Sequence, residues 1–252
     1  MSRIGFIGTG HIAAPMVRHL TAKGHTIFVT RRNAAISADL HATCGATVCD
    51  PQNVVEQAEI VFLCVRPQYA REVLEPLRFR PGQGIVSVMA GVPRTELLEH
   101  CAPAKQIVQM IPLGFLEKGG CPLAAFGDTG HLPDLFAPEN PVVPVDTEAA
   151  LNAHFAICAF VPGLLDLIDT AAGWLADTTG DTDRAEFFTS QLITGFLAAM
   201  ETSRAGHLAE ERDALATPNT LSLQMTEALH AGGAHDALRG ALGAIGTRLG
   251  AP

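Results

Sequence analysis

The sequence predicts an α/β fold in which an N-terminal, doubly wound and mostly parallel sheet is followed by an all-helical C-terminal domain. A glycine-rich turn follows a short apolar strand at residues 3–7. Strand-like and helical runs then alternate up to about residue 145, as in a parallel sheet covered on both faces. Beyond that point the strand signal stops and apolar residues recur at helical spacing. We therefore expect two domains, residues 1–145 and 146–252.

Seven apolar runs in the first domain are predicted to be strands. They lie at residues 3–7, 26–30, 46–49, 60–65, 84–89, 106–110 and 122–126. Four prolines then punctuate a stretch without helical period, which we interpret as a linker; they are Pro133, Pro138, Pro141 and Pro144. Helices are expected at 155–175, 185–208 and 221–249.

The turn after the first strand reads Gly-x-Gly-x-x-Ala. Gly8 permits a tight turn, Gly10 lets the backbone approach a pyrophosphate, and Ala13 is small enough for close packing of helix on strand. The N-terminus of the following helix presents unpaired N–H groups to phosphates. The alternative is a plain strand–turn–helix without a ligand. The pattern favours a Rossmann domain with Gly8, Thr9, Gly10, His11 and Ile12 at the cofactor.

The end of the second strand indicates which dinucleotide is bound. NAD-binding domains usually carry an acidic residue about 20 residues past the glycines, where it binds the ribose 2′-hydroxyl. Here the chain reads Thr30-Arg31-Arg32. A guanidinium matches a 2′-phosphate, and a carboxylate would repel it. The alternative is a pair of solvated loop arginines; we predict NADP(H) as the cofactor.

Composition excludes several classes of protein. The net charge of −9 argues against nucleic acid or an anionic membrane as partner. The longest apolar runs, such as residues 60–65, are too short to cross a bilayer. No charged-then-apolar leader precedes the first strand, so we expect a cytoplasmic protein. The six cysteines form no CxxC pair and the histidines do not cluster, so no metal site is predicted.

Short motifs along nearly the whole chain resemble the pyrroline-5-carboxylate reductase family, within the 6-phosphogluconate and β-hydroxyacid dehydrogenase-like superfamily. Residues 5–10 are similar to its opening, residues 64–68 to its VKPQ turn, and residues 86–92 to its SxxAGV strand. Residues 110–112 fall near its MPN turn and residues 217–220 near its TPGGTT loop. The resemblance implies reduction of an imine by a nicotinamide cofactor, a place in proline biosynthesis, and a homodimer of intertwined C-terminal helices.

The resemblance also implies roles for individual residues. It adds Cys64, Val65, Arg66 and Ala90 to the cofactor site. Thr220 matches the loop threonine and is the candidate catalytic residue, with a helix N-cap as the alternative role. The implied contacts to a small-molecule substrate come from seven residues: Pro112, Leu113, Pro162, Gly163, Asn219, Thr220 and Ser222.

Departures from the family pattern concentrate at the substrate loops. The family asparagine after Met-Pro is Leu113, and its GSGPA segment reads Ala-Phe-Val-Pro-Gly over residues 159–163, without the serine. Its glycine pair is replaced by Asn219. Since backbone N–H groups of glycine-rich turns suit carboxylates, we expect altered substrate recognition.

Other activities are weighed against this one. Pro15-Met16 is similar to the β-hydroxyacid dehydrogenases, but their helical domain carries a catalytic lysine and this chain has no lysine after Lys118. The alternatives kept are NADP-dependent reduction of a keto acid or a deazaflavin, and a non-catalytic NADP(H)-binding protein.

A broad apolar stripe predicts self-association. It comprises Phe187, Phe188, Leu192, Ile193, Phe196, Leu197 and Met200. A helical domain of about 100 residues has little core with which to cover such a face. We therefore expect a homodimer through the C-terminal helices; burial of the stripe inside one chain is the alternative.

Overall fold

The computed structural model describes residues 1–202 and 204–251. It separates into two compact units: Met1–Phe155 together with the C-terminal residues from Gly246, and Ala156–Ile245. The predicted boundary at 145/146 lies before this division, which falls within α7 (Glu148–Cys158). Glu148 accepts a hydrogen bond from the backbone N–H of Arg94, 2.7 Å away, so the first turn of α7 is held by the first unit.

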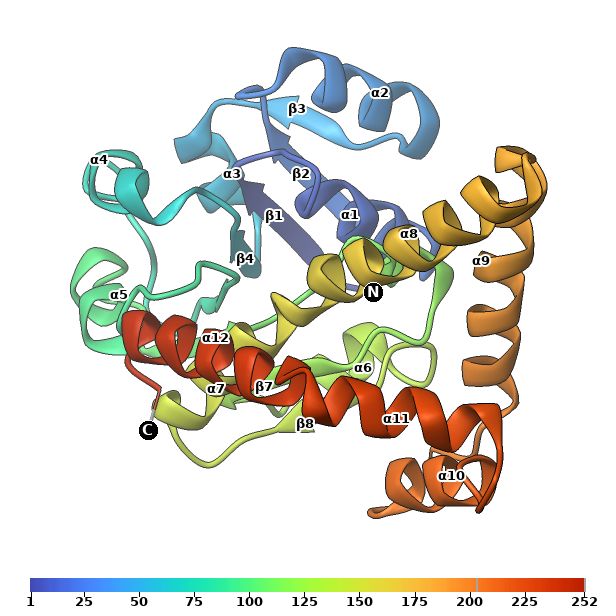
Figure 1. Ribbon diagram of the computed structural model, residues 1–252. Helices are drawn as coiled ribbons and strands as arrows, with labels where there is room; N and C mark the ends of the chain where they lie inside the picture. Colours follow the sequence, from blue (N-terminus) through green and yellow to red (C-terminus); the bar gives the residue numbers. More distant parts are fainter. Residues whose placement is uncertain (203, 252) are drawn as a thin grey trace. The chain divides into compact units, whose positions relative to one another are not determined.

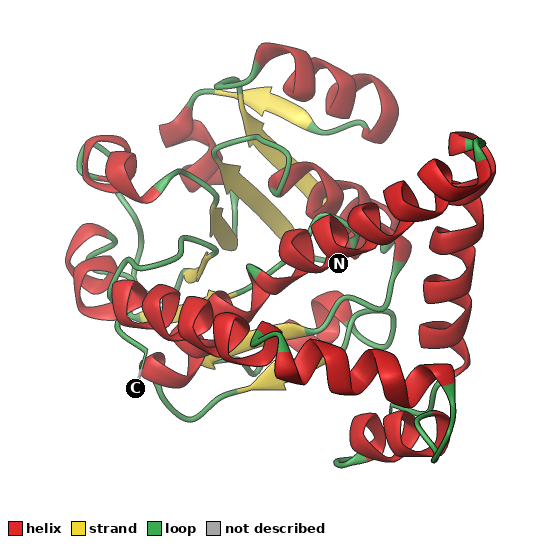
Figure 2. Ribbon diagram, viewed as in Figure 1, coloured by secondary structure: helices red, strands yellow, loops and turns green. Residues whose placement is uncertain are grey.

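The first unit contains one eight-stranded sheet with the order β3-β2-β1-β4-β5-β6-β7-β8. Its strands, drawn as yellow arrows in Figure 2, are parallel except where β6 meets β7. The bounds are β1 Arg3–Ile7, β2 Thr26–Thr30, β3 Thr47–Cys49, β4 Ile60–Leu63, β5 Gly84–Ser87, β6 Gln106–Met110, β7 Leu123–Gly127 and β8 Val142–Pro144. The seven predicted strands are all present, and the predicted fold class is confirmed.

Helices cover both faces of this sheet (Figure 1). The bounds are α1 Ala13–Ala22, α2 Ala34–Cys44, α3 Pro51–Gln57, α4 Ala70–Leu74, α5 Arg94–His100 and α6 Leu132–Phe136, with 3₁₀ turns η1 Pro67–Tyr69 and η2 Leu116–Lys118. The start of α2 is fixed by Asn33, whose side chain accepts from the N–H of Ile36 at 3.2 Å. It ends at Gly45, in the left-handed region at φ 68°.

The core follows the two-residue period of the strands. Phe6 and Phe62 face α1, α2 and α6, and their rings stack 4.8 Å apart. Ile7 and Val61, one position along each strand, face α3, α4 and α5 on the other side. Both faces of the sheet are therefore buried from solvent, as expected for a doubly wound sheet.

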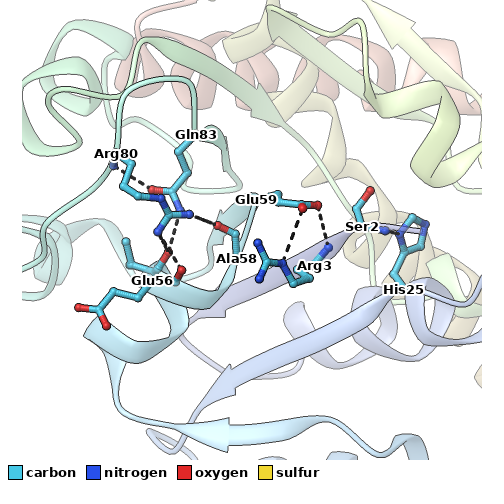
Figure 3. A network of polar contacts seen from close by, with 9 residues as sticks. Ser2, Arg3, His25, Glu56, Ala58, Glu59, Arg80 and Gln83 are labelled. Atoms are coloured by element: carbon cyan, nitrogen blue, oxygen red, sulfur yellow. Dashed lines mark hydrogen bonds and ion pairs between the residues drawn. The ribbon is translucent and has the colours of Figure 1, made fainter.

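Polar contacts tie together the elements at the amino ends of β1, β2 and β4 (Figure 3). Arg80 donates to three carbonyls at the end of α3, among them that of Ala58 at 2.6 Å. The side chain of Gln83 donates to the Ala58 carbonyl as well. A cation at the C-terminus of a helix complements the helix dipole. Structural contacts thus occupy the amino ends of these strands. A ligand can bind at their carboxyl ends.

The prediction that the stretch from Pro133 to Pro144 is a linker is wrong. This stretch contains α6 and the edge strand β8, which pairs parallel to β7 with Leu123 opposite Val142. A proline within an edge strand costs no inner ladder hydrogen bond, so Pro144 is tolerated there.

Among its described residues, the second unit contains helices joined by short loops and no strand. Its helices are α8 Phe160–Thr179, α9 Thr182–Ala199, α10 His207–Leu215, α11 Leu221–Ala231 and α12 Ala234–Leu249, the last of which runs into the first unit. Gly180 ends α8 in the left-handed region at φ 74°, and Asp181 caps α9 by accepting from the N–H of Arg184 at 3.0 Å.

One helical stretch, Glu148–Thr179, is long and apolar enough to cross a membrane by length and composition, and its most apolar 18-residue window has a mean hydropathy of 1.7. This corrects the expectation that the apolar runs are too short, which counted uninterrupted runs only. Just 11% of the most apolar window is buried within the chain. Interface helices of oligomers share this composition, so the stretch is weak evidence for a membrane.

Candidate functional site

The glycine turn connects the carboxyl end of β1 to α1. Gly8 has φ +92°, and a Cβ placed there would lie 2.6 Å from the carbonyl oxygen of Cys64 at the end of β4. Gly8 is therefore required both for the turn and for close packing of β1 against β4. A Cβ at Gly10 would meet nothing within 4 Å. The space over Gly10 is open, as the approach of a pyrophosphate requires.

Two threonine hydroxyls brace this turn against the end of β2. The backbone N–H of Gly8 donates to Thr30 Oγ1 at 2.9 Å, and Thr9 Oγ1 donates to the carbonyl of Thr30 at 2.7 Å. Both threonines are buried. Thr9 and Thr30 thus belong to the predicted site as groups that hold its backbone in place.

The N-terminus of α1 follows the glycine turn directly, and none of the described side chains caps it. The N–H of Ala14 donates to the carbonyl of Gly10 at 3.0 Å and Pro15 has no N–H, so the donors that remain for an anion are those of the turn up to Ala13. Ala13 is fully buried, in agreement with a small residue where helix meets strand. Ile12 and His11 are exposed beside it, and His11 lines a separate cavity of about 450 Å³ with Arg18.

A cavity of about 390 Å³ lies beside the glycine turn, at the carboxyl ends of β1, β2 and β3. It is lined by Gly8, Thr30, Arg31, Arg32, Cys49, Asp50, Pro51, Val65 and others. Arg31 and Arg32 are exposed at one wall, and Val65 forms part of another. Basic donors beside an open glycine turn fit a phosphorylated adenosine.

Sequence reasoning missed two residues of this cavity region. Asp50, at the end of β3, lines the same cavity as the arginines, although the end of β2 itself carries no carboxylate. Tyr69, in η1, lies under the guanidinium of Arg32, whose Cζ is 4.9 Å from the ring centroid. A signal was available for both, because each follows a parallel strand and ligands bind outside the carboxyl ends of such strands.

Two thiols, those of Cys49 and Cys64, lie near the glycine turn and have raised pKa values. Burial raises the pKa of Cys64 well above its ordinary value. Burial, and then the neighbouring Asp50 carboxylate, raise the pKa of Cys49. Because only a thiolate is a good nucleophile, these groups suit a role in packing. Arg66, which follows Val65, is exposed.

The turn after β5, which contains Ala90, is held by a polar network. The side chain of Gln109 is 4% exposed and donates to the carbonyl of Val92 at 3.0 Å. It donates also to Glu148 Oε1 at 2.8 Å, which accepts the Arg94 N–H as well. This network fixes the turn that the family resemblance assigns to the cofactor.

The remaining predicted substrate residues occupy three places. Pro112 is buried after β6, and Leu113 is half-buried and packs against the core. Pro162 and Gly163 lie exposed in the first turn of α8. Asn219, Thr220 and Ser222 lie at the start of α11 in the helical unit.

Thr220 is the N-cap of α11. Its Oγ1 accepts from the N–H of Leu223 at 3.1 Å and donates to the carbonyl of Thr217 at 2.7 Å. The capping alternative is therefore present in the structure. Asn219 has φ 68° and is the one non-glycine residue with positive φ among residues 1–202 and 204–251. Asparagine tolerates this region, so the loop keeps a glycine-like bend without the glycine pair.

An open glycine turn beside a cavity with two arginines, on a doubly wound sheet, fits an NAD(P)-dependent oxidoreductase. A family model described as NADP oxidoreductase, coenzyme F420-dependent, matches residues 3–91. The chain is 25% identical over 98% of its length to the pyrroline-5-carboxylate reductase of Pseudomonas aeruginosa, of which 95% is covered. Along nearly its whole length the chain is thus similar to a pyrroline-5-carboxylate reductase.

Solved structures agree on the fold. The pyrroline-5-carboxylate reductase of Streptococcus pyogenes matches with a TM-score of 0.83 at 18% identity, over 99% of this chain and 98% of that one. The Plasmodium falciparum pyrroline carboxylate reductase, solved with NADP bound, also gives a TM-score of 0.83, at 14% identity over 99% and 97% of the two chains.

Proposed function

We propose that the protein is an NADPH-dependent reductase of a C=N bond. The observation that carries this proposal is the open space over Gly10 next to a cavity, at the ends of β1 and β2, that Gly8, Arg31 and Arg32 line. When bound, the reduced nicotinamide supplies the hydride, and the protein positions it and provides the proton. The carbon of the imine accepts the hydride and its nitrogen accepts the proton.

Thr220 is proposed to hold the proton source. Its own proton is donated to the Thr217 carbonyl, but its oxygen accepts only one backbone N–H. A hydroxyl oxygen has two acceptor positions, so a water can donate to the second. Ser222, two residues along and exposed, is the alternative group.

Pyrroline-5-carboxylate itself is expected to be a poor substrate. Phe160 and Val161 place bulky side chains where the family has serine and glycine, and Asn219 alone replaces the glycine pair, which removes one backbone N–H from the loop proposed to bind the carboxylate. NADPH oxidation should be measured on cyclic imines with and without a carboxylate. We expect kcat/KM on pyrroline-5-carboxylate well below roughly 10⁴ M⁻¹s⁻¹, an ordinary enzyme value, and faster turnover of another imine.

The same measurement includes two competing activities. The family model that matches residues 3–91 favours reduction of a deazaflavin as the second candidate, and keto acids are the third. Turnover of either in place of imines would overturn the imine proposal. NADPH binding with no turnover of any acceptor would indicate a non-catalytic binding protein. A family-level rate on pyrroline-5-carboxylate would show that the altered loops still serve the parent reaction and proline biosynthesis.

We also propose a cytoplasmic homodimer formed through the helical unit. Within α9, Phe187 and Phe188 are 69% and 60% exposed, and Leu192, Phe196 and Leu197 are exposed too. Trp174 of α8, the only tryptophan, is 69% exposed. Large contiguous apolar surfaces mark interaction sites, and a two-fold interface would cover this one.

Light scattering tests the dimer at low micromolar concentration. We expect about 53 kDa, twice the 26.5 kDa of one chain, because obligate interfaces typically exceed about 2,000 Å². Phe188→Glu should produce monomers, since it places a charge in the proposed interface. Val143→Glu, on the edge strand of the other unit, is the matched control and should leave the dimer intact. A wild-type monomer with full helical content would contradict the proposal.

A further inference from the structure

The contact of Arg32 with the ring of Tyr69 joins the loops that follow β2 and β4, beside the cavity that Arg31 and Arg32 line. Arg32 follows β2, and Tyr69 follows β4. These strands flank β1 in the sheet, so the two loops lie on either side of the glycine turn (Figure 1). Arg32 lines the cavity itself. Tyr69 does not line it but lies, in the sequence, between Val65 and Val73, which both do.

We propose that Tyr69 is the positioning residue that presents Arg32 to the 2′-phosphate of the cofactor, and thereby helps to set the preference for NADPH over NADH. This inference rests on the proposed function. Tyr69 acts through Arg32 and is not assigned a contact with the reacting atoms.

The geometry of the guanidinium carries the inference. A stack on an aromatic ring uses the face of the guanidinium and leaves its five N–H donors, which lie in the plane, available to a phosphate. Within the described residues, Arg32 takes part in no hydrogen bond or ion pair with a protein group. By contrast, Arg18 and Arg80 direct their donors to protein oxygens. The contact with the ring therefore positions Arg32, and the N–H donors of its guanidinium remain available to a phosphate.

The position of Tyr69 supports a role beyond packing. Its side chain is 36% exposed, whereas the next residue, Ala70, is buried and anchors α4. The ring holds an exposed arginine in one orientation, which lowers the rotamer entropy that Arg32 loses when it binds an anion.

Binding of two adenosine fragments tests this role. Calorimetry should compare 2′,5′-ADP with 5′-AMP, which lacks the 2′-phosphate, on the full chain. In Tyr69→Leu we expect about two- to fivefold weaker binding of 2′,5′-ADP, the size of an exposed cation–π contact, and unchanged binding of 5′-AMP. Tyr69→Phe keeps the ring and should bind both ligands as wild type does. In an Arg32→Ala background, Tyr69→Leu should have no further effect.

The chain offers a direct spectroscopic probe, because Tyr69 is its only tyrosine. Ring-¹³C tyrosine labelling gives signals from this residue alone. We expect them to shift on addition of 2′,5′-ADP, and to shift less in Arg32→Ala at saturating ligand.

The outcomes distinguish the role of Tyr69 from the proposed preference for NADPH, on which it rests. If wild type binds 2′,5′-ADP no better than 5′-AMP, the NADPH preference fails and this inference with it. If wild type prefers 2′,5′-ADP but folded Tyr69→Leu keeps the same preference, only the role of Tyr69 is wrong. Equal weakening of both ligands in Tyr69→Leu would show that the ring contacts adenosine and does not act through Arg32.

Discussion

Arg31→Ala/Arg32→Ala is expected to lose most of the preference for NADPH over NADH. Each charge-assisted hydrogen bond to a phosphate contributes about 1.5–3 kcal/mol, so each lost bond weakens NADPH binding by roughly ten- to a hundredfold. Both side chains are solvent-exposed at the cavity, which places the effect at the lower end of this range. NADH lacks the 2′-phosphate and should bind the variant about as well as it binds wild type.

Titration of both cofactors, followed by fluorescence or calorimetry, measures this preference. Arg71→Ala is the charge-matched control for each single variant, because it removes a positive charge from an exposed i,i+4 ion pair with Glu75 on α4, outside the cavity. It should leave both dissociation constants unchanged. Equal affinity of the wild-type protein for NADPH and NADH would contradict the assignment of the cofactor.

The second large effect is expected at Gly10. Gly10→Val should abolish the binding of NADPH and NADH alike, because the new side chain would fill the space over the turn that the pyrophosphate needs. The fold should survive. A Cβ at this position meets no atom within 4 Å, and the backbone of Gly10 lies outside the left-handed region.

Two further variants make this experiment specific. Gly130→Val adds the same side chain to an exposed loop glycine away from the cavity and should bind normally. Gly8→Val should instead destabilise the protein, because its Cβ would lie 2.6 Å from the Cys64 carbonyl at a φ of +92°. Circular dichroism confirms folding in each case. If folded Gly10→Val binds NADPH normally, the pyrophosphate lies elsewhere.

The glycine turn and the strands of the first unit could be predicted because their signals are local. Alternating residues such as Phe6 and Ile7 face opposite sides of a strand, so both must be apolar when helices cover both faces. The conformational demand on Gly8 also follows from its own backbone. Accordingly, Arg31 and Arg32, which we predicted to bind the adenosine end of the cofactor, line the same cavity as Gly8 of the glycine turn.

Features that depend on the position of a strand in the sheet could not be predicted from local sequence patterns. β8 contains Pro144 and lies among other prolines, a pattern typical of a linker. It forms a strand because it adds to the edge of a sheet already built, where one side of the ladder needs no donor. The helical stretch Glu148–Thr179 was expected only over residues 155–175, and its apolar length was underestimated because polar residues interrupt the apolar runs.

By itself, the sequence determined the fold class, the glycine turn after β1 and the basic end of β2, because each depends on neighbours within a few residues. Only the tertiary structure decided that Asp50 and Arg32 line one cavity and that Tyr69 contacts Arg32 beside it. The strand order β3-β2-β1-β4 brings together three loops that are far apart in the chain. Local periodicity carries no information on strand order, because order is set by how helices and crossovers pack over the whole sheet.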